Sequence, residues 1–260
     1  MRHPRLFSMI VATALAIIGA LAPDSVPAQA PVQPQTPTTP QAPVKPGPYK
    51  AIAITLPTPM SDASFDEFRK QLAGIAQKRD HAALAQLLAA SFFWIPGDKD
   101  VADRSKAGID NLAEAIDLSG ADAAGWEVVF DYTAETTVMP DPEHPGVICA
   151  PAHPAYDQKA ADELLEATQT KASDWVYPVR DGVEIYARPQ SRPPVVEKLG
   201  LHLVRVLDDD ADAESFLKVI TPSGKIGYVA EKAIRDLDGP QMCYVKEESG
   251  WKIAGLHGSY

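Results

Sequence analysis

The hydrophobic periodicity of the chain changes near residue 175, and this change limits the possible folds more than any other feature. Before it, apolar residues recur at helical spacing, as in Phe65, Phe68, Leu72 and Ile75. After it, apolar and polar residues alternate, as in residues 183–187, which is typical of strands. We therefore expect an α+β protein with a small, mostly helical N-terminal unit followed by an all-β unit.

The first thirty residues have the order of a secretory signal peptide. Arg2 and Arg5 precede an apolar run over residues 6–21, and the segment ends with the small residues Ala28 and Ala30. Cleavage after Ala30 predicts a periplasmic or secreted protein. An uncleaved anchor is the alternative, because about 17 apolar residues can just span a bilayer. No later segment is apolar enough to cross a membrane, so we expect no stable membrane insertion after cleavage.

Residues 31–49 form a proline-rich linker in which proline recurs at every third position from Pro31 to Pro46. A polyproline II helix has three residues per turn, so this spacing places the prolines along one edge. The composition is typical of a semi-rigid spacer. The alternative is a docking ligand for an aromatic groove on another protein.

Residues 50–160 read as a helical α+β unit that resembles no family we can name. Ser64 and Glu67 match a capping box at the start of the first helix. Asp80 and Ser105 are suitable caps for two further helices. A polar helix is expected over residues 160–170.

Short strands separated by turn residues follow in the second half. We expect strands over residues 183–187, 195–199, 201–207, 215–221 and 225–229, with a last hairpin formed by residues 241–246 and 251–256. Pro222-Ser223-Gly224 is a tight hairpin signal. Strands this closely spaced are typical of a small barrel.

The motifs in this region resemble the bacterial SH3-like (SH3b) domain over residues 175–237, about a quarter of the chain. They are Val183 to Pro189, Val195-Val196-Glu197-Lys198-Leu199-Gly200, Leu201 to Leu207, Phe216-Leu217-Lys218-Val219 and Gly224-Lys225-Ile226-Gly227-Tyr228-Val229. The first loop departs from the family pattern, with Ile185 to Pro189 in place of the usual Asn-Val-Arg-Ser-Gly. The resemblance implies an SH3-like all-β barrel over residues 174–260 and noncatalytic binding of peptidoglycan or of a peptide.

Aromatic residues of this region are candidates for ligand contact. Tyr186 and Tyr228 are the expected groove residues, because rings supply contact area at low entropic cost. Arg188, beside Tyr186, is placed to pair with a ligand carboxylate. Phe216 and Trp251 are expected in the core.

The two cysteines, Cys149 and Cys243, predict one disulfide in an exported protein. It would close a loop of almost a hundred residues. Two free thiols and a nucleophilic cysteine are the alternatives. For the nucleophile, Cys149 has His153 four residues on, but the surrounding prolines indicate an extended segment in which the two side chains lie about 13 Å apart.

Charge and residue spacing exclude several function classes. The formal net charge is −11 without a basic stripe, which argues against a nucleic-acid partner. The histidines are scattered without a zinc motif. The acidic run at residues 208–214 opens like a calcium loop but lacks its glycine, and a solvated hairpin tip explains it better. We expect no metal and no cofactor.

The resulting hypothesis is a noncatalytic exported cell-envelope protein. Its SH3b-like domain would bind peptidoglycan fragments or an extended peptide of a partner protein. The alternative is an envelope enzyme or enzyme inhibitor with its site in residues 50–160. A third reading makes the β unit purely structural, clamped to the helical unit by Cys149 and Cys243.

Overall fold

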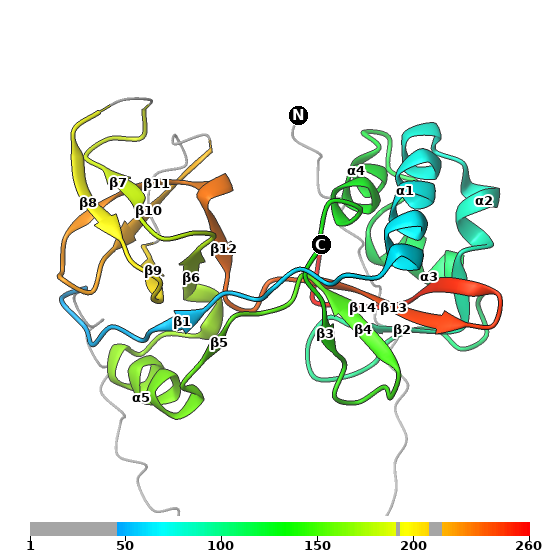
Figure 1. Cartoon of the computed structure of the whole chain (residues 1–260), viewed down its shortest axis with the longest axis horizontal. Coiled ribbons are helices and arrows are strands. Elements are labelled where there is room, and N and C mark those ends of the chain that lie inside the picture. Colours follow the sequence, from blue (N-terminus) through cyan, green and yellow to red (C-terminus); the bar gives the residue numbers. More distant parts are fainter. Residues whose placement is uncertain (1–45, 191–192, 208–214) are drawn as a thin grey trace, which may run out of the picture. The chain divides into compact units, whose positions relative to one another are not determined.

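The structure, a computed structural model, describes residues 46–190, 193–207 and 215–260. The predicted signal peptide, the proline repeat up to residue 45 and the acidic run at 208–214 lie outside these residues. Figure 1 labels the elements in chain order. They are β1 (Ile54–Thr55), α1 (Ala63–Lys78), α2 (His81–Ala85), β2 (Leu88–Ile95), α3 (Gly108–Ala115), α4 (Ala124–Tyr132), β3 (Met139–Pro140), β4 (Val147–Ala150), β5 (Ala155–Tyr156), α5 (Gln158–Thr168), the 3-10 turn η1 (Ala172–Asp174), β6 (Trp175–Pro178), β7 (Val183–Tyr186), β8 (Val195–Leu199), β9 (Val204–Val206), β10 (Phe216–Ile220), β11 (Ile226–Ala230), the 3-10 turn η2 (Glu231–Ala233), β12 (Ile234–Asp236), β13 (Gln241–Glu247) and β14 (Gly250–His257).

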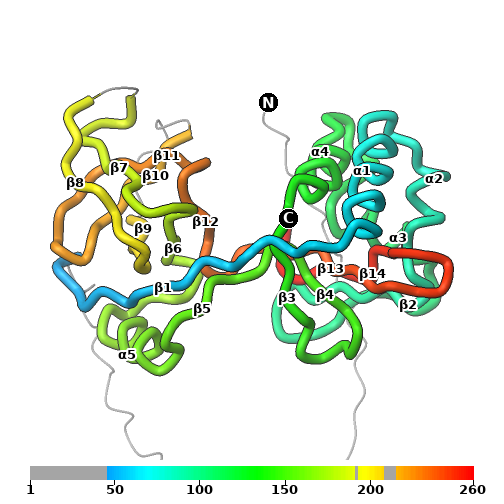
Figure 2. Tube along the Cα trace, in the orientation of Figure 1, coloured from blue at the N-terminus to red at the C-terminus, as the bar shows by residue number. Residues whose placement is uncertain are grey.

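A five-stranded sheet combines strands from both ends of the described chain, in the order β2-β14-β13-β4-β3. The C-terminal hairpin β13–β14 occupies its middle: β13 pairs antiparallel with β4, and β14 pairs parallel with β2. Figure 2 shows this hairpin, in red, beside the green β4 and the cyan-green β2. The segment between β4 and β13 is therefore a long insertion between two neighbouring strands of one sheet.

Helices α1, α3 and α4 pack on one face of this sheet. Their apolar residues share a core cluster with the strand residues that point to that face, among them Met242, Tyr244, Ile253 and Leu256, which are all fully buried. The opposite face carries a smaller cluster formed by Phe93, Val147, Cys149, Cys243 and Ala254. The alternation of side chains along each strand thus divides the sheet into a helix-covered face and a second face that holds both cysteines.

The inserted segment forms a seven-stranded sheet in the order β12-β6-β9-β10-β11-β7-β8, with every neighbouring pair antiparallel. One face buries a cluster that includes Val183, Ile185, Val219 and Val229. A second cluster joins this sheet to α5 and to the two-stranded β1–β5 ladder through Ile54, Leu164 and Trp175, among others. The N-terminal segment before α1 thus contributes to the core beside the inserted sheet.

The predicted fold class is wrong. We expected a small, mostly helical unit followed by a single SH3-like all-β barrel, and the structure has a five-stranded and a seven-stranded sheet with few helices. Among the described strands the seven-stranded sheet ends at β8 and β12, so it does not close into a barrel. The apolar runs in β2 and β4, at residues 88–95 and 147–150, are strands whose partners lie far away along the chain, up to the pairing of Leu88 with Ile253. Local periodicity does not reveal such a pairing.

The predicted start of the first helix is also wrong in detail. Asp62, not Ser64, is the N-cap of α1, and its carboxylate accepts hydrogen bonds from the backbone N–H groups of Ser64 and Phe65. The Ser64 hydroxyl instead accepts a hydrogen bond from Trp251 Nε1 at 3.0 Å. The predicted cap at Asp80 is confirmed, because its carboxylate accepts from the N–H of Ala83. Among the described residues, no helix has the length and apolarity needed to span a bilayer.

Candidate functional site

The two tyrosines predicted to contact a ligand lie side by side in the seven-stranded sheet. Tyr186 on β7 is the direct cross-strand partner of Tyr228 on β11, so both side chains project from the same face. Phe216 on β10, which we expected in the core, is only half-buried, and its ring lies 6.4 Å from that of Tyr186 in an edge-on arrangement. The register thus gathers three aromatic side chains from three neighbouring strands.

Two exposed aliphatic residues extend this surface. Val195 on β8 pairs with Tyr186 and is 46% exposed, and Ile226, two residues before Tyr228, is 49% exposed. We call the surface formed by Tyr186, Val195, Phe216, Ile226 and Tyr228 the aromatic face. Large exposed apolar side chains on one strand surface indicate a contact site more strongly than singly scattered ones do.

Charged groups orient the aromatic face at Tyr186. The Tyr186 hydroxyl donates to Glu184 Oε2 at 3.1 Å, and Lys198 Nζ lies 3.3 Å from Glu184 Oε1. The hydrogen bonds from Tyr186 and then from Lys198 lower the pKa of Glu184, whereas the bond to this carboxylate raises the pKa of Tyr186. The phenol therefore stays neutral at physiological pH, with its hydroxyl held by Glu184 and its ring available for contact.

Arg188 is exposed just beyond the end of β7. Its backbone carbonyl accepts a hydrogen bond from the N–H of Gln190 at 2.9 Å. The segment that continues from Gln190 includes residues 191–192, outside the described range. The role predicted for Arg188, pairing with a ligand carboxylate, stays a prediction.

The predicted disulfide between Cys149 and Cys243 is present, with the two residues directly opposite each other on β4 and β13. Both cysteines are buried. Because the sulfur of Cys149 is bonded to that of Cys243, Cys149 has no free thiol and does not form a catalytic dyad with His153. The His153 ring instead has a nitrogen 3.3 Å from the backbone carbonyl of Gly239.

A buried polar cluster that the sequence did not reveal lies beside this disulfide. We call it the Asp141 cluster; its members are Asp141, His144, Cys149, Cys243 and His257. Asp141 follows β3 directly, and its side chain has no solvent exposure. Its Oδ2 lies 2.6 Å from His257 Nε2, and its Oδ1 lies 3.0 Å from His144 Nδ1. The ring of Phe93 stacks on His144 with a centroid separation of 4.0 Å.

The carboxylate of Asp141 is held in its ionised form by its partners. Burial raises the pKa of Asp141, but hydrogen bonds from His257, from the N–H groups of Glu143 and His144, and from the His144 ring outweigh it. The net pKa is therefore below the usual range for an aspartate. Buried carboxylates are retained where such donors are available, because an unpaired buried charge is strongly destabilising.

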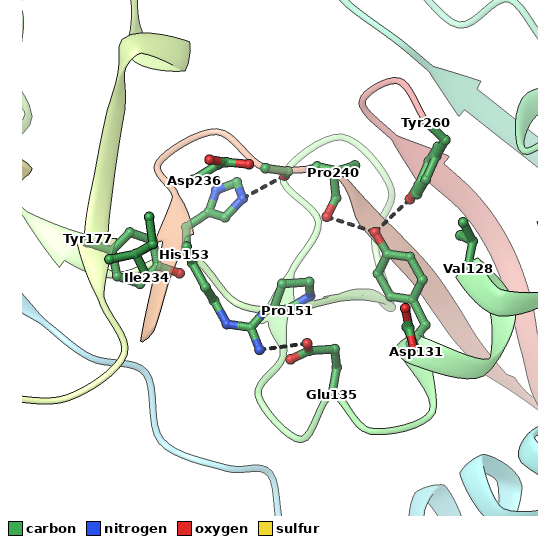
Figure 3. Close-up of a pocket in the computed structure, with 13 residues that line it drawn as sticks. Val128, Asp131, Glu135, Pro151, His153, Tyr177, Ile234, Asp236, Pro240 and Tyr260 are labelled. Atoms are coloured by element: carbon green, nitrogen blue, oxygen red, sulfur yellow. Dashed lines mark hydrogen bonds and ion pairs between the residues drawn. The ribbon is translucent and has the colours of Figure 1, made fainter. Parts of the chain in front are cut away.

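A separate pocket of about 340 Å³ is shown in Figure 3. Its lining includes Tyr132, His153 and Tyr260, together with the ion pair between Glu135 and Arg235, whose charged atoms are 2.7 Å apart. The Tyr132 hydroxyl donates to the carbonyl of Pro240 at 2.9 Å, and burial raises the pKa of Tyr132 to about 12. Burial lowers the pKa of His153, so its ring is neutral at physiological pH.

Comparisons with known proteins supply no family. No protein-family model and no curated protein matches the chain. Among solved structures, a "putative ketosteroid isomerase" from Shewanella frigidimarina NCIMB 400 aligns with 10% sequence identity over 75% of this chain and 94% of that chain. The TM-score of 0.22 is too low for this match to support any conclusion about fold or function.

Proposed function

We propose that this chain is a noncatalytic exported protein of the cell envelope and that its aromatic face binds peptidoglycan fragments. The observation that carries the proposal is the side-by-side placement of Tyr186, Phe216 and Tyr228 on one face of the seven-stranded sheet. Aromatic rings present large, rigid contact areas at low entropic cost.

Because the chain is acidic, its binding to peptidoglycan must depend on short-range contacts and not on attraction between net charges. The chain carries a net charge of −11, so it repels acidic wall polymers at distances where only the net charges interact. Stacking and hydrogen bonding act only on contact, and high salt screens the repulsion. We therefore expect binding to peptidoglycan to strengthen, not weaken, as the salt concentration rises.

Export is compatible with the disulfide, since disulfides persist in oxidising compartments outside the cytoplasm. In this proposal the signal peptide is cleaved after Ala30, and the proline-rich linker, predicted over residues 31–49, acts as a spacer between a surface and the folded region. The folded region already includes Tyr49, whose ring packs against Trp175. The motifs of residues 175–237 resemble those of SH3b domains, which often bind peptidoglycan or peptides, although the described strands of this segment do not fold into an SH3-like barrel.

Sedimentation of the purified protein with insoluble peptidoglycan tests the proposal. The unmodified protein should be retained, and Tyr186→Ala and Tyr228→Ala should each weaken retention by about 5- to 30-fold, the range for losing one aromatic anchor of a binding site. Phe130→Ala is the matched control, because Phe130 is an aromatic residue on α4 that is 41% exposed, away from the aromatic face. It should be retained like the unmodified protein.

The outcomes separate wall binding from its competitors. Recovery of the unmodified protein in the supernatant at both low and high salt would exclude peptidoglycan as the ligand. Capture of an extended peptide with the same dependence on Tyr186 and Tyr228 would then favour a partner protein. Equal loss of retention in all three variants, Phe130→Ala included, would show that the aromatic face is not the site.

The pocket in Figure 3 favours a second candidate, an envelope enzyme. The expected site in residues 50–160 supplies only part of its lining, since Tyr177, Arg235 and Tyr260 also line it. Asp131, Glu135 and His153 all line this pocket, and a neutral histidine can act as a general base. Binding remains the leading proposal because Glu135 is already paired with Arg235. Release of soluble fragments from peptidoglycan by the unmodified protein, abolished in His153→Ala, would favour the enzyme instead.

A further inference from the structure

Four members of the Asp141 cluster, all except His144, place a possible metal-ligand atom close to one another. Cys149 comes from β4, Cys243 from β13 and His257 from the end of β14, three adjacent strands, while Asp141 comes from the loop after β3. One donor atom from each of these four residues lies within 4.8 Å of every other. Four ligands around Zn²⁺ at about 2.0–2.3 Å are roughly 3.3–3.8 Å from one another. Binding an ion here would require the two sulfurs to separate from their bonded distance of 2.03 Å and Asp141 Oδ2 to move away from His257 Nε2, now 2.6 Å distant. The pairs that are farther apart would move closer together.

Hydrogen bonds fix the Asp141 carboxylate so that one oxygen faces the other donors. Its Oδ1 accepts from the N–H groups of Glu143 at 2.8 Å and His144 at 2.9 Å, and lies 3.0 Å from His144 Nδ1. Its Oδ2 lies 2.6 Å from His257 Nε2 and 3.5 Å from Cys149 Sγ. A ligating carboxylate whose second oxygen is held by outer hydrogen bonds is typical of protein metal sites.

The disulfide prevents these four residues from binding a metal ion in the structure described. A disulfide sulfur carries neither a proton nor a negative charge, so the contact between Cys149 Sγ and Asp141 Oδ2 is not a hydrogen bond. Zinc requires thiolates, and neither cysteine can supply one while the S–S bond is intact. Disulfide and metal are therefore alternative ways of joining β4 to β13 at the same two residues.

We infer that Asp141, Cys149, Cys243 and His257 form a tetrahedral Zn²⁺ site when the disulfide is reduced. A dithiol reductant transfers two electrons and two protons, breaking the S–S bond and leaving two thiols while it becomes a disulfide itself. Zn²⁺ then replaces the two thiol protons, which go to solvent, and binds two thiolates, one carboxylate and one neutral imidazole. The ligand set Cys₂-His-Asp has the soft and nitrogen donors that zinc prefers.

The burial of the site makes it a structural site and not a catalytic one. The side chain of Asp141 is fully buried and both cysteines are at most 2% exposed, so four protein donors leave no room for a water ligand. The His257 side chain is 26% exposed and provides the side from which an ion can enter. The ion would hold together the two strands at which the inserted segment begins and ends.

Titration of the anaerobically reduced full-length protein with Co²⁺, a spectroscopic substitute for Zn²⁺, is the decisive experiment. We expect one ion per chain, visible ligand-field bands of tetrahedral cobalt and a thiolate-to-cobalt charge-transfer band, all abolished by excess Zn²⁺. The oxidised protein should show none of these bands. Absence of the charge-transfer band in reduced protein, or the same spectrum from oxidised protein, would overturn the inference.

Variants identify the ligands. Asp141→Asn and Cys243→Ser should weaken Zn²⁺ binding more than ~10-fold, and His144→Gln, which removes an outer hydrogen bond, by about 10-fold. His153→Gln is the control, because His153 follows Cys149 closely in sequence but lies near the Gly239 carbonyl. Loss of binding in His153→Gln equal to that in Asp141→Asn would contradict the assignment.

A second measurement covers the case in which a variant or the reduced protein unfolds. Reaction of the two thiols of the unmodified protein with a disulfide reagent should be slowed when Zn²⁺ is present, and a chelator should restore the rate. If reduction unfolds the protein, Zn²⁺ should restore its near-ultraviolet circular dichroism. Unprotected thiols and a failure to refold with Zn²⁺ would each count against the site.

Discussion

Cys149 and Cys243 face each other across β4 and β13 although they are 94 positions apart in the sequence. The bond between their sulfurs therefore lies where the inserted segment leaves the five-stranded sheet and where it returns. The seven-stranded sheet lies within this covalent loop, since β6 to β12 all fall between the two cysteines.

Removing the disulfide should destabilise the protein substantially. A loop of this length contributes up to about 4–5 kcal/mol if the bond acts by restricting the unfolded chain. The Cys149→Ser, Cys243→Ser double variant should therefore unfold at clearly lower urea concentration than the oxidised protein, measured by circular dichroism. In metal-free buffer, the unmodified protein under reducing conditions should match the double variant. A double variant as stable as the oxidised protein would show that the bond contributes nothing to stability.

Local structure in the second half of the chain could be predicted because it depends on neighbouring residues. The strand predicted over residues 195–199 is β8, and the strands predicted near residues 183–187, 215–221 and 225–229 are β7, β10 and β11 with small shifts at their ends. The turn at Pro222-Ser223-Gly224 joins β10 to β11 as expected. The alternation of side chains and the turn residues are local signals, so strands and turns can be predicted from them without knowing the fold.

The arrangement of these elements could not be predicted, because it depends on pairings between distant segments. Nothing in residues 88–95 indicates that β2 pairs with β14. For β4, the predicted bond between Cys149 and Cys243 indicated that β13 lies close by, but it did not reveal that the two are paired strands of one sheet. The Asp141 cluster was missed for the same reason, since its donors come from a loop and three strands. By contrast, Tyr186 and Tyr228 could be named from the sequence because both lie in strands of one local segment, and their role in ligand binding stays a prediction.

A close approach in the five-stranded sheet should make Gly255 intolerant of a side chain. A Cβ at this position would lie 2.5 Å from the ring of Phe93, which is itself buried and stacked on His144. Gly255→Ala should lower the free energy of unfolding by about 1–3 kcal/mol through overpacking.

Gly74→Ala provides the matched control for Gly255→Ala, because a Cβ at Gly74 meets no atom within 4 Å. Gly74 lies inside α1, where alanine is favoured over glycine by about 0.5–1 kcal/mol. The two substitutions should thus shift the midpoint of thermal or urea unfolding in opposite directions. Stabilisation by Gly255→Ala would mean that Phe93 can move aside.

Removing the hydroxyl of Tyr244 should stabilise the protein. The residue is fully buried against Phe65 and Phe68, and its hydroxyl has no hydrogen-bond partner among the described residues. Burying an unpaired hydroxyl costs about 1–3 kcal/mol. Tyr244→Phe keeps the ring and removes this cost, so we expect a gain of about 1 kcal/mol in the free energy of unfolding.

The same substitution at Tyr132 should have the opposite sign, because the Tyr132 hydroxyl donates to the carbonyl of Pro240 and bonds with Tyr260. Tyr132→Phe should cost about 1 kcal/mol. Urea unfolding of both variants provides the comparison. A loss of stability in Tyr244→Phe comparable to that in Tyr132→Phe would show that the Tyr244 hydroxyl does have a partner in solution.

The N-cap of α1 should make stability depend on pH in the acid range. Hydrogen bonds from the Ser64 hydroxyl and then from the N–H of Phe65 lower the pKa of Asp62 to about 2, against about 3.9 in an unfolded chain. Between these values the unfolded chain binds more protons, so the contribution of Asp62 is complete above about pH 4 and is lost as the pH falls through about 2. Asp62→Asn keeps an oxygen acceptor but does not titrate, so the stability difference between Asp62→Asn and the unmodified protein should shrink across this range.

Urea unfolding from pH 7 down to pH 2 measures this difference directly. Ser64→Ala is the second variant, because it removes the largest cause of the lowered pKa of Asp62. The pKa of Asp62 should then rise toward its ordinary value, and the acid loss of stability should move to higher pH. A difference between Asp62→Asn and the unmodified protein that stays constant from pH 7 to pH 2 would show that the folded state does not favour the ionised Asp62.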